Sequence, residues 1–216
     1  MAPGAEGRPA VRLVLTMVTD RRRLAPGALA DRVGEMARAG LDAVQLREKD
    51  LSDRALRALA GEVRAALSGT STRLLVNGRP DVALAAGADG VQLPENGLPV
   101  GEVKRAFPTL VVGASCHSME AARRAAGEGA DFVLLGPVFP PSAKEARALG
   151  VETLRAVVEA VSVPVHAIGG VTPRRAAEVM AAGGRGAAAI AAFLDGPADA
   201  IMGAFREADG GPRGRP

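Results

Sequence analysis

Short apolar runs alternate along the chain with longer segments rich in alanine, arginine and glutamate. The runs predict buried strands, and the longer segments predict amphipathic helices. Strand and helix repeated at roughly 20 to 30 residues are typical of βα units that build a parallel sheet. Eight such units favour a closed (β/α)₈ TIM barrel, as a single domain, over an open doubly wound sheet. The predicted strands are 11–18, 42–47, 72–76, 89–92, 110–114, 131–135, 164–168 and 186–190, and the predicted helices are 27–39, 52–68, 79–86, 100–107, 118–128, 149–160, 173–182 and 197–207.

The composition limits both the core and the ligands of such a barrel. With 216 residues, 48% of them hydrophobic, the chain is long enough for one domain, which we place at 11–208 between disordered tails at 1–10 and 209–216. Aromatic residues make up only 2% of the chain, with no Trp and no Tyr, so the usual stacking platforms for single-stranded nucleic acid are missing. The net charge of +3 favours a small anionic ligand over nucleic acid.

The chain has one cysteine, Cys116, which excludes an internal disulfide and a cysteine-rich metal site and suits a reducing compartment. Residues 1–10 lack the apolar stretch of a secretory signal, and no apolar run in the sequence is long enough to cross a bilayer. We therefore expect a cytoplasmic protein without membrane contact. The sequence leaves a homo-oligomer open.

The second predicted strand carries long polar side chains on one face. Because successive strand residues point to opposite sides, Gln45, Arg47 and Lys49 share a face, while the other face is apolar. Two unpaired cations on a covered face are costly, so this arrangement predicts a bound anion between them. The alternative is an exposed strand face whose charges are solvated.

Glycines and small residues follow strands 7 and 8, where (β/α)₈ barrels commonly bind phosphate. We expect the backbone N–H groups of Gly169, Gly170, Ala191 and Ala192 to approach the phosphate. The alternative is a tight turn capped by Thr172. Lys144, on the long loop after strand 6, is a further candidate for the same ligand, although a lone loop lysine is often plain solvent-facing charge.

His117 follows strand 5 and is the candidate proton carrier, because histidine titrates near neutral pH. The alternative is a histidine at a helix terminus with Ser118 as the N-cap. Neighbouring Cys116 is expected to be a buried small hydrophobe rather than half of a Cys-His dyad. His166 lies in mid-strand, which favours a structural role with its ring hydrogen-bonded.

Asn77 follows strand 3, where its amide can orient a polar ligand. For Arg79 and Asp81 the structural interpretation is that they begin the next helix, with Pro80 in its first turn. No group of residues has metal-ligand spacing, because Asp20, Glu48 and Glu95 come from separate loops. A catalytic metal is therefore not indicated.

Taken together, these motifs resemble the thiamine phosphate synthase and TenI superfamily, small (β/α)₈ barrels of thiamine biosynthesis. The resemblance covers nearly all of residues 12–207. The residues that carry it are Val18–Asp20, Gln45–Lys49, Val76–Arg79, Gly87–Pro94, Gly113–Ser118, Leu135–Phe139 and Ala167–Gly170.

The resemblance also bears on the branch of the superfamily. Synthases carry two aspartates for Mg²⁺, one directly after the strand 3 asparagine and one shortly after strand 4, and these positions look like Gly78 and Gly97. The ending around His117 is similar to that of the TenI-like thiazole tautomerases, in which the matching histidine is catalytic. Residues 45–49, by contrast, look more like a synthase.

From this resemblance we expect a thiazole tautomerase that needs no cofactor and aromatises a carboxy-thiazole phosphate by a proton shift at His117. Arg47, Lys49 and Lys144 would balance negative charge, and Gln45 and Asn77 would orient the ring. The first alternative is a thiamine phosphate synthase, which joins an aminopyrimidine diphosphate to the thiazole phosphate with Mg²⁺. The second is a non-catalytic barrel that binds a phosphate ligand.

Overall fold

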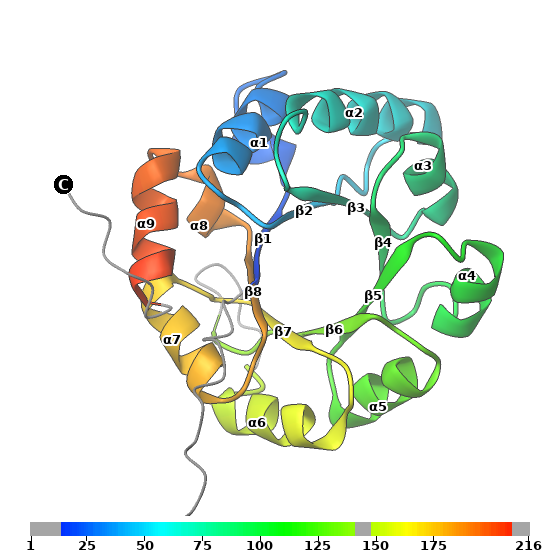
Figure 1. The fold of residues 1–216 in the computed structure, drawn as a ribbon, viewed down its shortest axis with the longest axis vertical. Helices are drawn as coiled ribbons and strands as arrows, with labels where there is room; N and C mark the ends of the chain where they lie inside the picture. The colour runs from blue at the N-terminus through cyan, green and yellow to red at the C-terminus, as the bar shows by residue number, and fades with distance from the viewer. Residues whose placement is uncertain (1–13, 141–147, 209–216) are drawn as a thin grey trace, which may run out of the picture.

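The computed structural model describes residues 14–140 and 148–208. Eight parallel strands close into a barrel in chain order, with helices around the outside (Figure 1), which confirms the predicted (β/α)₈ fold. Each strand pairs with the next along the chain, and the ring closes where Val14 of the first strand stands opposite Gly186 of the last. The strands are β1 Val14–Val18, β2 Ala43–Leu46, β3 Arg73–Asn77, β4 Gly90–Leu93, β5 Val111–Cys116, β6 Phe132–Leu135, β7 Val165–Ile168 and β8 Gly186–Ala189.

The helices follow the predicted order with two additions. A 3-10 turn, η1, occupies Arg21–Arg23, and a four-residue helix, α8 Ala191–Leu194, precedes the helix expected at 197–207. Within the described ranges, no helix combines the length and apolar character needed to cross a membrane. The other helices are α1 Leu29–Arg38, α2 Asp53–Ala66, α3 Pro80–Ala85, α4 Val100–Ala106, α5 Met119–Gly127, α6 Val151–Ala160, α7 Pro173–Ala181 and α9 Ala198–Ala208.

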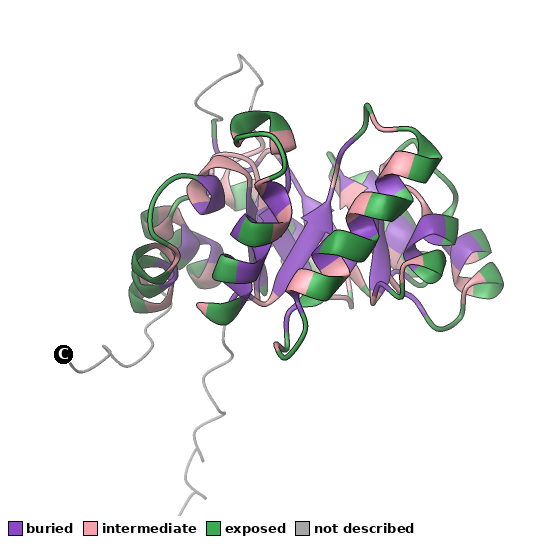
Figure 2. Cartoon of the chain, turned by 90° about the horizontal axis from the view of Figure 1, so that it is seen from above, coloured by how far each residue is buried: buried purple, intermediate pink, exposed green. Residues whose placement is uncertain are grey.

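Two apolar cores hold these layers together. The larger core lies between the sheet and the inward faces of the helices, so buried residues line the strands and one stripe of each helix (Figure 2). The smaller core lies inside the barrel and consists of Val18, Leu134 and Ala188, with Ile168 and Ile190 packed against them. This inner cluster fills the barrel axis below the carboxyl ends of the strands.

Glycine ends several helices just before the next strand, as the sequence predicts. Gly40, Gly87, Gly129 and Gly183 all have positive φ, between +63° and +95°. This backbone conformation is strained for other residues, so a glycine here lets the chain turn sharply into the following strand.

Three aspartates, each two residues after such a glycine, anchor the amino-terminal ends of alternate strands. Asp42, Asp89 and Asp131 stand directly before β2, β4 and β6. Each carboxylate accepts a hydrogen bond of 2.7 to 2.8 Å from a backbone N–H in the preceding strand, donated by Leu15, Leu74 and Val112 respectively. Each also pairs with a cation from the outer layer, namely Arg206, Arg64 and Lys104. These hydrogen bonds and ion pairs fix the register of the strands at the amino-terminal end of the barrel, opposite the end where the active site is predicted.

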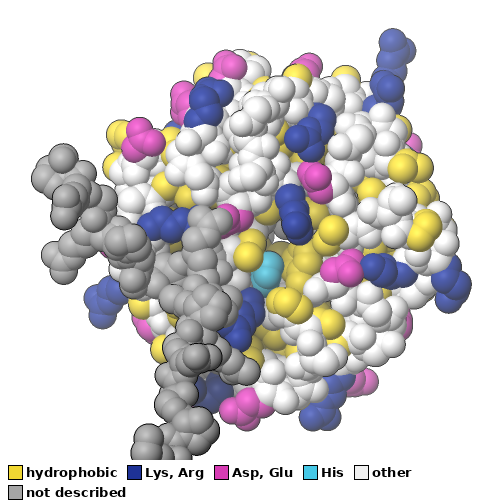
Figure 3. All heavy atoms as spheres, in the orientation of Figure 1, with side chains coloured by type: hydrophobic (Ala, Val, Ile, Leu, Met, Phe, Trp, Pro, Cys, Tyr) yellow, Lys and Arg dark blue, Asp and Glu magenta, His cyan; other side chains and the backbone are white. Residues whose placement is uncertain are grey.

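A hollow of about 580 Å³ opens at this amino-terminal end, and His166 lies along it. Figure 3 shows a hollow near the middle of the face that it views. The His166 ring stacks on Phe132 with ring centroids 4.7 Å apart, and a Cβ at Gly186 would meet the ring at 2.4 Å. The predicted structural role is confirmed, but no described residue forms the predicted hydrogen bond with the His166 ring. Stacking and the neighbouring glycine hold it instead.

Burial makes His166 a pH-dependent element of stability. It lowers the pKa of His166 from 6.5 to about 4. Between these two pH values the unfolded chain binds a proton at His166 that the folded protein excludes. The contribution of His166 to the free energy of unfolding is therefore fully present above about pH 6.5 and is lost as the pH falls toward 4. We expect the loss to reach about 3 kcal/mol. Denaturant unfolding of wild type and His166→Gln at pH 7 and pH 4.5 measures it, and equal losses in the two proteins would contradict the assignment.

Candidate active site

A cavity of about 380 Å³ opens at the carboxyl ends of the strands, where (β/α)₈ barrels place their chemistry. Each of the eight strands, or the segment directly after it, contributes to its wall. The apolar floor is formed by Val18, Leu134, Ile168 and Ile190 of the inner core. The remaining lining residues are Gln45, Arg47, Lys49, Asn77, Pro94, Glu95, Ser115, His117, Gly136, Pro137 and Gly169.

The three polar residues predicted to share a face all line this cavity. Gln45 is buried in β2, whereas Arg47 and Lys49 follow the strand at the cavity edge. Neither cation forms an ion pair or hydrogen bond through its side chain with any described residue. Two unpaired cations beside a concave, partly apolar surface favour an anionic ligand.

The buried carboxylate of Glu48, which lies between the two cations in the sequence, fixes the backbone that carries them. Glu48 accepts hydrogen bonds from the Thr19 hydroxyl at 2.7 Å and from the backbone N–H of Arg21 at 3.0 Å. The Thr19 oxygen in turn accepts the backbone N–H of Arg47 at 2.9 Å. Arg21 also binds Asp50 through two hydrogen bonds, which hold the pKa of the Asp50 carboxyl well below its usual range. The loops after β1 and β2 therefore form one unit that presents Arg47.

Amide side chains form a second polar wall. The Gln45 amide donates to Asn77 Oδ1 at 3.1 Å, so the two predicted orienting residues contact each other. Behind them, buried Gln92 donates to the Ser115 hydroxyl at 3.1 Å. These bonds hold the amides in place and leave further donors and acceptors of Gln45 and Asn77 for a ligand.

His117 lies directly after β5 and pairs with a residue that the sequence did not connect to it. Glu95 Oε2 lies 2.6 Å from His117 Nδ1 and also accepts the backbone N–H of His117 at 2.7 Å. The side chain of His117 is 64% exposed, and that of Glu95 is 25% exposed. The one signal in the sequence that could have identified Glu95 as a site residue is its position two residues after β4. The expected N-cap is present as well, because Ser118 Oγ accepts the N–H of Ala121.

The predicted phosphate loops are close to the cavity but contribute unequally. Gly169 lines the cavity, whereas Gly170, Ala191 and Ala192 do not. Gly170 follows Gly169 in the sequence, and Ala191 and Ala192 follow the lining residue Ile190. The backbone N–H groups of these four residues donate no hydrogen bond to a described acceptor. Their role toward phosphate stays a prediction. Lys144 lies outside the described residues.

Gly170 has a structural constraint of its own. Its φ is +62°, and a Cβ at this position would meet Pro140 O at 2.6 Å and Phe139 at 2.9 Å. Arg175 donates to the Gly170 carbonyl at 2.7 Å and stacks over the Phe139 ring. A substitution at Gly170 would therefore disturb the fold and the loop together, which makes it a poor probe of phosphate binding.

Two other predicted roles concern residues outside the cavity lining. Cys116 is 1% exposed, and burial raises the pKa of its thiol to about 12, so it is a buried hydrophobe and not a nucleophile. Arg79 pairs with Asp81 and Asp53 on the outside of the barrel, where Pro80 begins α3. Both observations confirm the structural interpretations made from the sequence.

The residues at the cavity do not fit a Mg²⁺ site. Gly78, at one of the two positions where synthases carry aspartate, has a φ of +69°, and a Cβ at Gly97, the other position, would lie 3.0 Å from Pro94 O. The backbone at both positions therefore suits glycine rather than aspartate. Of the nearby carboxylates, Glu48 is bound to Thr19 and Arg21, and Glu95 is bound to His117. No group of three metal-ligating side chains occurs in the described part of the chain.

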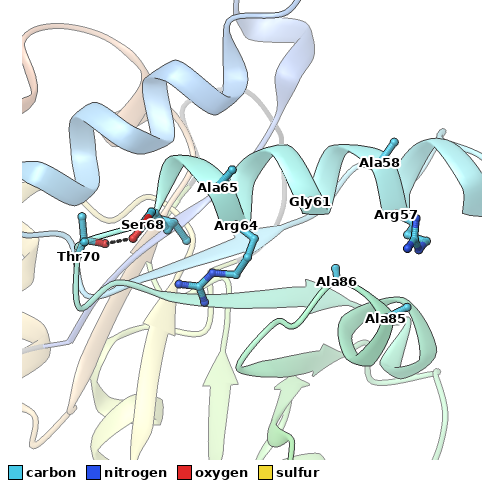
Figure 4. Close-up of a pocket in the computed structure, with 11 residues that line it drawn as sticks. Arg57, Ala58, Gly61, Arg64, Ala65, Ser68, Thr70, Ala85 and Ala86 are labelled. Atoms are coloured by element: carbon cyan, nitrogen blue, oxygen red, sulfur yellow. Dashed lines mark hydrogen bonds between the residues drawn. The ribbon is translucent and has the colours of Figure 1, made fainter.

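The molecule has another hollow on its flank, of about 680 Å³, between α2 and α3 (Figure 4). Alanines and glycines make up much of its lining, together with Arg57 and Arg64. Arg64 is occupied by its ion pair with Asp89 at the base of β4. This groove lacks the convergent polar groups of the cavity at the barrel mouth.

Comparison with known proteins identifies the family of this chain. A family model described as thiamine monophosphate synthase matches residues 15–193. A putative thiamine-phosphate synthase 2 of Aquifex aeolicus is 44% identical over 182 residues, covering 84% of this chain and 97% of that protein. A thiamine-phosphate synthase of Methanoculleus marisnigri is 45% identical over 161 residues, covering 73% and 76%.

A solved structure also has the fold of this chain. Thiamine phosphate pyrophosphorylase from Pyrococcus furiosus superimposes with a TM-score of 0.83 at 35% identity, covering 94% of this chain and 98% of that chain. The match extends over the whole barrel. The chain therefore belongs to the thiamine monophosphate synthase family of thiamine-biosynthesis enzymes.

Proposed function

We propose that this family member is a thiazole tautomerase, which aromatises a carboxy-thiazole phosphate without a metal. The observation that carries the proposal is the composition of the cavity: a histidine held by a carboxylate, two unpaired cations, and glycine backbones where a synthase places its metal ligands. A proton shift needs a proton carrier and an anion clamp. It does not need a Lewis acid for a diphosphate leaving group.

In this proposal each residue has one task. His117 takes the proton from ring C2 and delivers a proton to the exocyclic carbon. Arg47 and Lys49 attract the negatively charged substrate, and the amides of Gln45 and Asn77 orient its ring. A volume of about 380 Å³ suits a ligand of this size. The backbone after β7 and β8 would receive the phosphate.

A second candidate function is thiamine phosphate synthase, and the comparisons favour it. Relatives of 38 to 45% identity, among them those of Aquifex aeolicus and Methanoculleus marisnigri, are named as putative or established thiamine-phosphate synthases. Residues 45–49 also resemble the synthase pattern. Against it stand Gly78 and Gly97, which would leave a diphosphate without its carboxylate-bound Mg²⁺.

A side-by-side assay separates the candidates. We expect the purified protein to aromatise the carboxy-thiazole phosphate at the same rate with EDTA and with added Mg²⁺. We expect no coupling of aminopyrimidine diphosphate to thiazole phosphate, with a relative of established synthase activity as the positive control. Coupling that EDTA abolishes and Mg²⁺ restores would establish the second candidate. Loss of both activities with retained binding of thiazole phosphate would indicate a non-catalytic barrel.

A further inference from the structure

We propose that Glu95 is the positioning residue of His117: its carboxylate accepts the Nδ1 proton, so that the unprotonated Nε2 is the nitrogen available to the substrate. The inference rests on the proposed function in one respect, namely that His117 is the proton carrier. It adds a residue that neither the sequence motifs nor the relatives' names assign, and it fixes the direction in which His117 starts the reaction.

The contact is anchored at two points, which distinguishes it from an ordinary surface ion pair. One oxygen, Glu95 Oε2, lies 2.6 Å from the His117 ring and 2.7 Å from the His117 backbone nitrogen. Because the backbone N–H always donates, it holds the carboxylate at the ring whatever the ring's protonation. A carboxylate is acceptor-only when ionised, so the nitrogen facing it carries hydrogen.

The backbone around Glu95 is also fixed. Pro94 lines the cavity just before it, and the Gly97 N–H donates to Pro94 O at 2.9 Å, which closes a tight turn. A Cβ at Gly97 would approach Pro94 O to 3.0 Å, so glycine suits this turn. The segment that carries a metal-binding aspartate in the synthase pattern thus presents a carboxylate to a histidine here.

The other ring nitrogen is left for chemistry. His117 Nε2 has no hydrogen-bond partner among the described residues, and His117 lines the same cavity as Arg47 and Lys49. In the tautomer set by Glu95, neutral Nε2 carries a lone pair and His117 begins as a base. It takes the C2 proton, and the resulting imidazolium, paired with Glu95, then returns a proton to the exocyclic carbon. The proton count balances, and no co-reactant is needed.

The first test reads the tautomer directly, without reference to activity. The chain contains only two histidines, so ¹⁵N-labelled side chains give few signals, and His117→Gln identifies those of His117. We expect the Nδ1–H form in wild type and its loss in Glu95→Ala, where the ring returns toward the Nε2–H form that predominates in unconstrained histidine. Glu120→Gln is the matched control, because Glu120 is exposed three residues after His117 and no hydrogen bond or ion pair joins the two side chains. An unchanged tautomer in Glu95→Ala overturns the proposal.

The second test uses kinetics of the aromatisation reaction. Glu95→Ala should lower kcat roughly 10- to 100-fold with little change in KM, because it misorients the proton carrier without removing a substrate contact. Glu95→Gln, whose amide oxygen can still accept from Nδ1, should recover part of kcat. A change in KM alone would overturn the positioning role. If the wild-type enzyme lacks aromatising activity but the tautomer responds to Glu95→Ala, the proposed function fails while the pairing stands.

Discussion

The substitution His117→Gln is expected to lower the turnover of thiazole aromatisation by at least about 100-fold, since general acid–base groups typically contribute about 10²- to 10⁴-fold in rate. His117 is the one histidine at the carboxyl ends of the strands, and its ring is held at the cavity wall by Glu95. Glutamine keeps a polar side chain of similar reach but cannot carry the proton. Steady-state kinetics with the carboxy-thiazole phosphate measures the effect.

Two controls belong to this experiment. The His117→Gln protein should unfold at nearly the wild-type denaturant concentration and should still bind the thiazole phosphate, because His117 is exposed. His166→Gln, at the other end of the barrel, should act mainly through stability. Near wild-type turnover in His117→Gln would mean that another group moves the proton or that the protein belongs to the synthase branch.

The second large effect is expected for ligand affinity. Arg47→Gln should weaken binding of the thiazole phosphate about 10- to 100-fold, since a hydrogen bond to a charged group contributes about 1.5 to 3 kcal/mol and each 1.4 kcal/mol is tenfold. Arg47 is preferred to Lys49 because it is less exposed and its backbone is held by Thr19. Titration calorimetry at two salt concentrations measures the affinity, and added salt should weaken wild-type binding more than that of the variant.

Arg57→Gln is the matched control for charge. It removes one exposed positive charge from the flank groove between α2 and α3, away from the cavity. Its affinity should equal that of wild type. If both arginine variants bind equally well, the anion does not lie beside Arg47, and the charge assignment of the cavity is wrong.

The fold was predictable because its signals are local. Runs of buried residues, glycines after helices and a strand–helix alternation depend on neighbours in the sequence, so the eight strands and their order followed directly. The positions of Gln45, Arg47 and Lys49 were predictable for the same reason, since alternation along a strand is a local rule. The short helix α8 and the turn η1 escaped prediction because they are too short to show a period.

What the sequence by itself determined is which residues stand at the carboxyl ends of the strands. Only the tertiary structure decided which of them contact one another. Glu95 and His117 are 22 residues apart, and Glu48 and Thr19 are 29 apart, on loops that barrel closure brings together. His166 gives the converse case, since a mid-strand histidine was expected to be hydrogen-bonded and instead stacks on Phe132. Hydrogen bonds between loops depend on distances in space that no periodicity along the chain records.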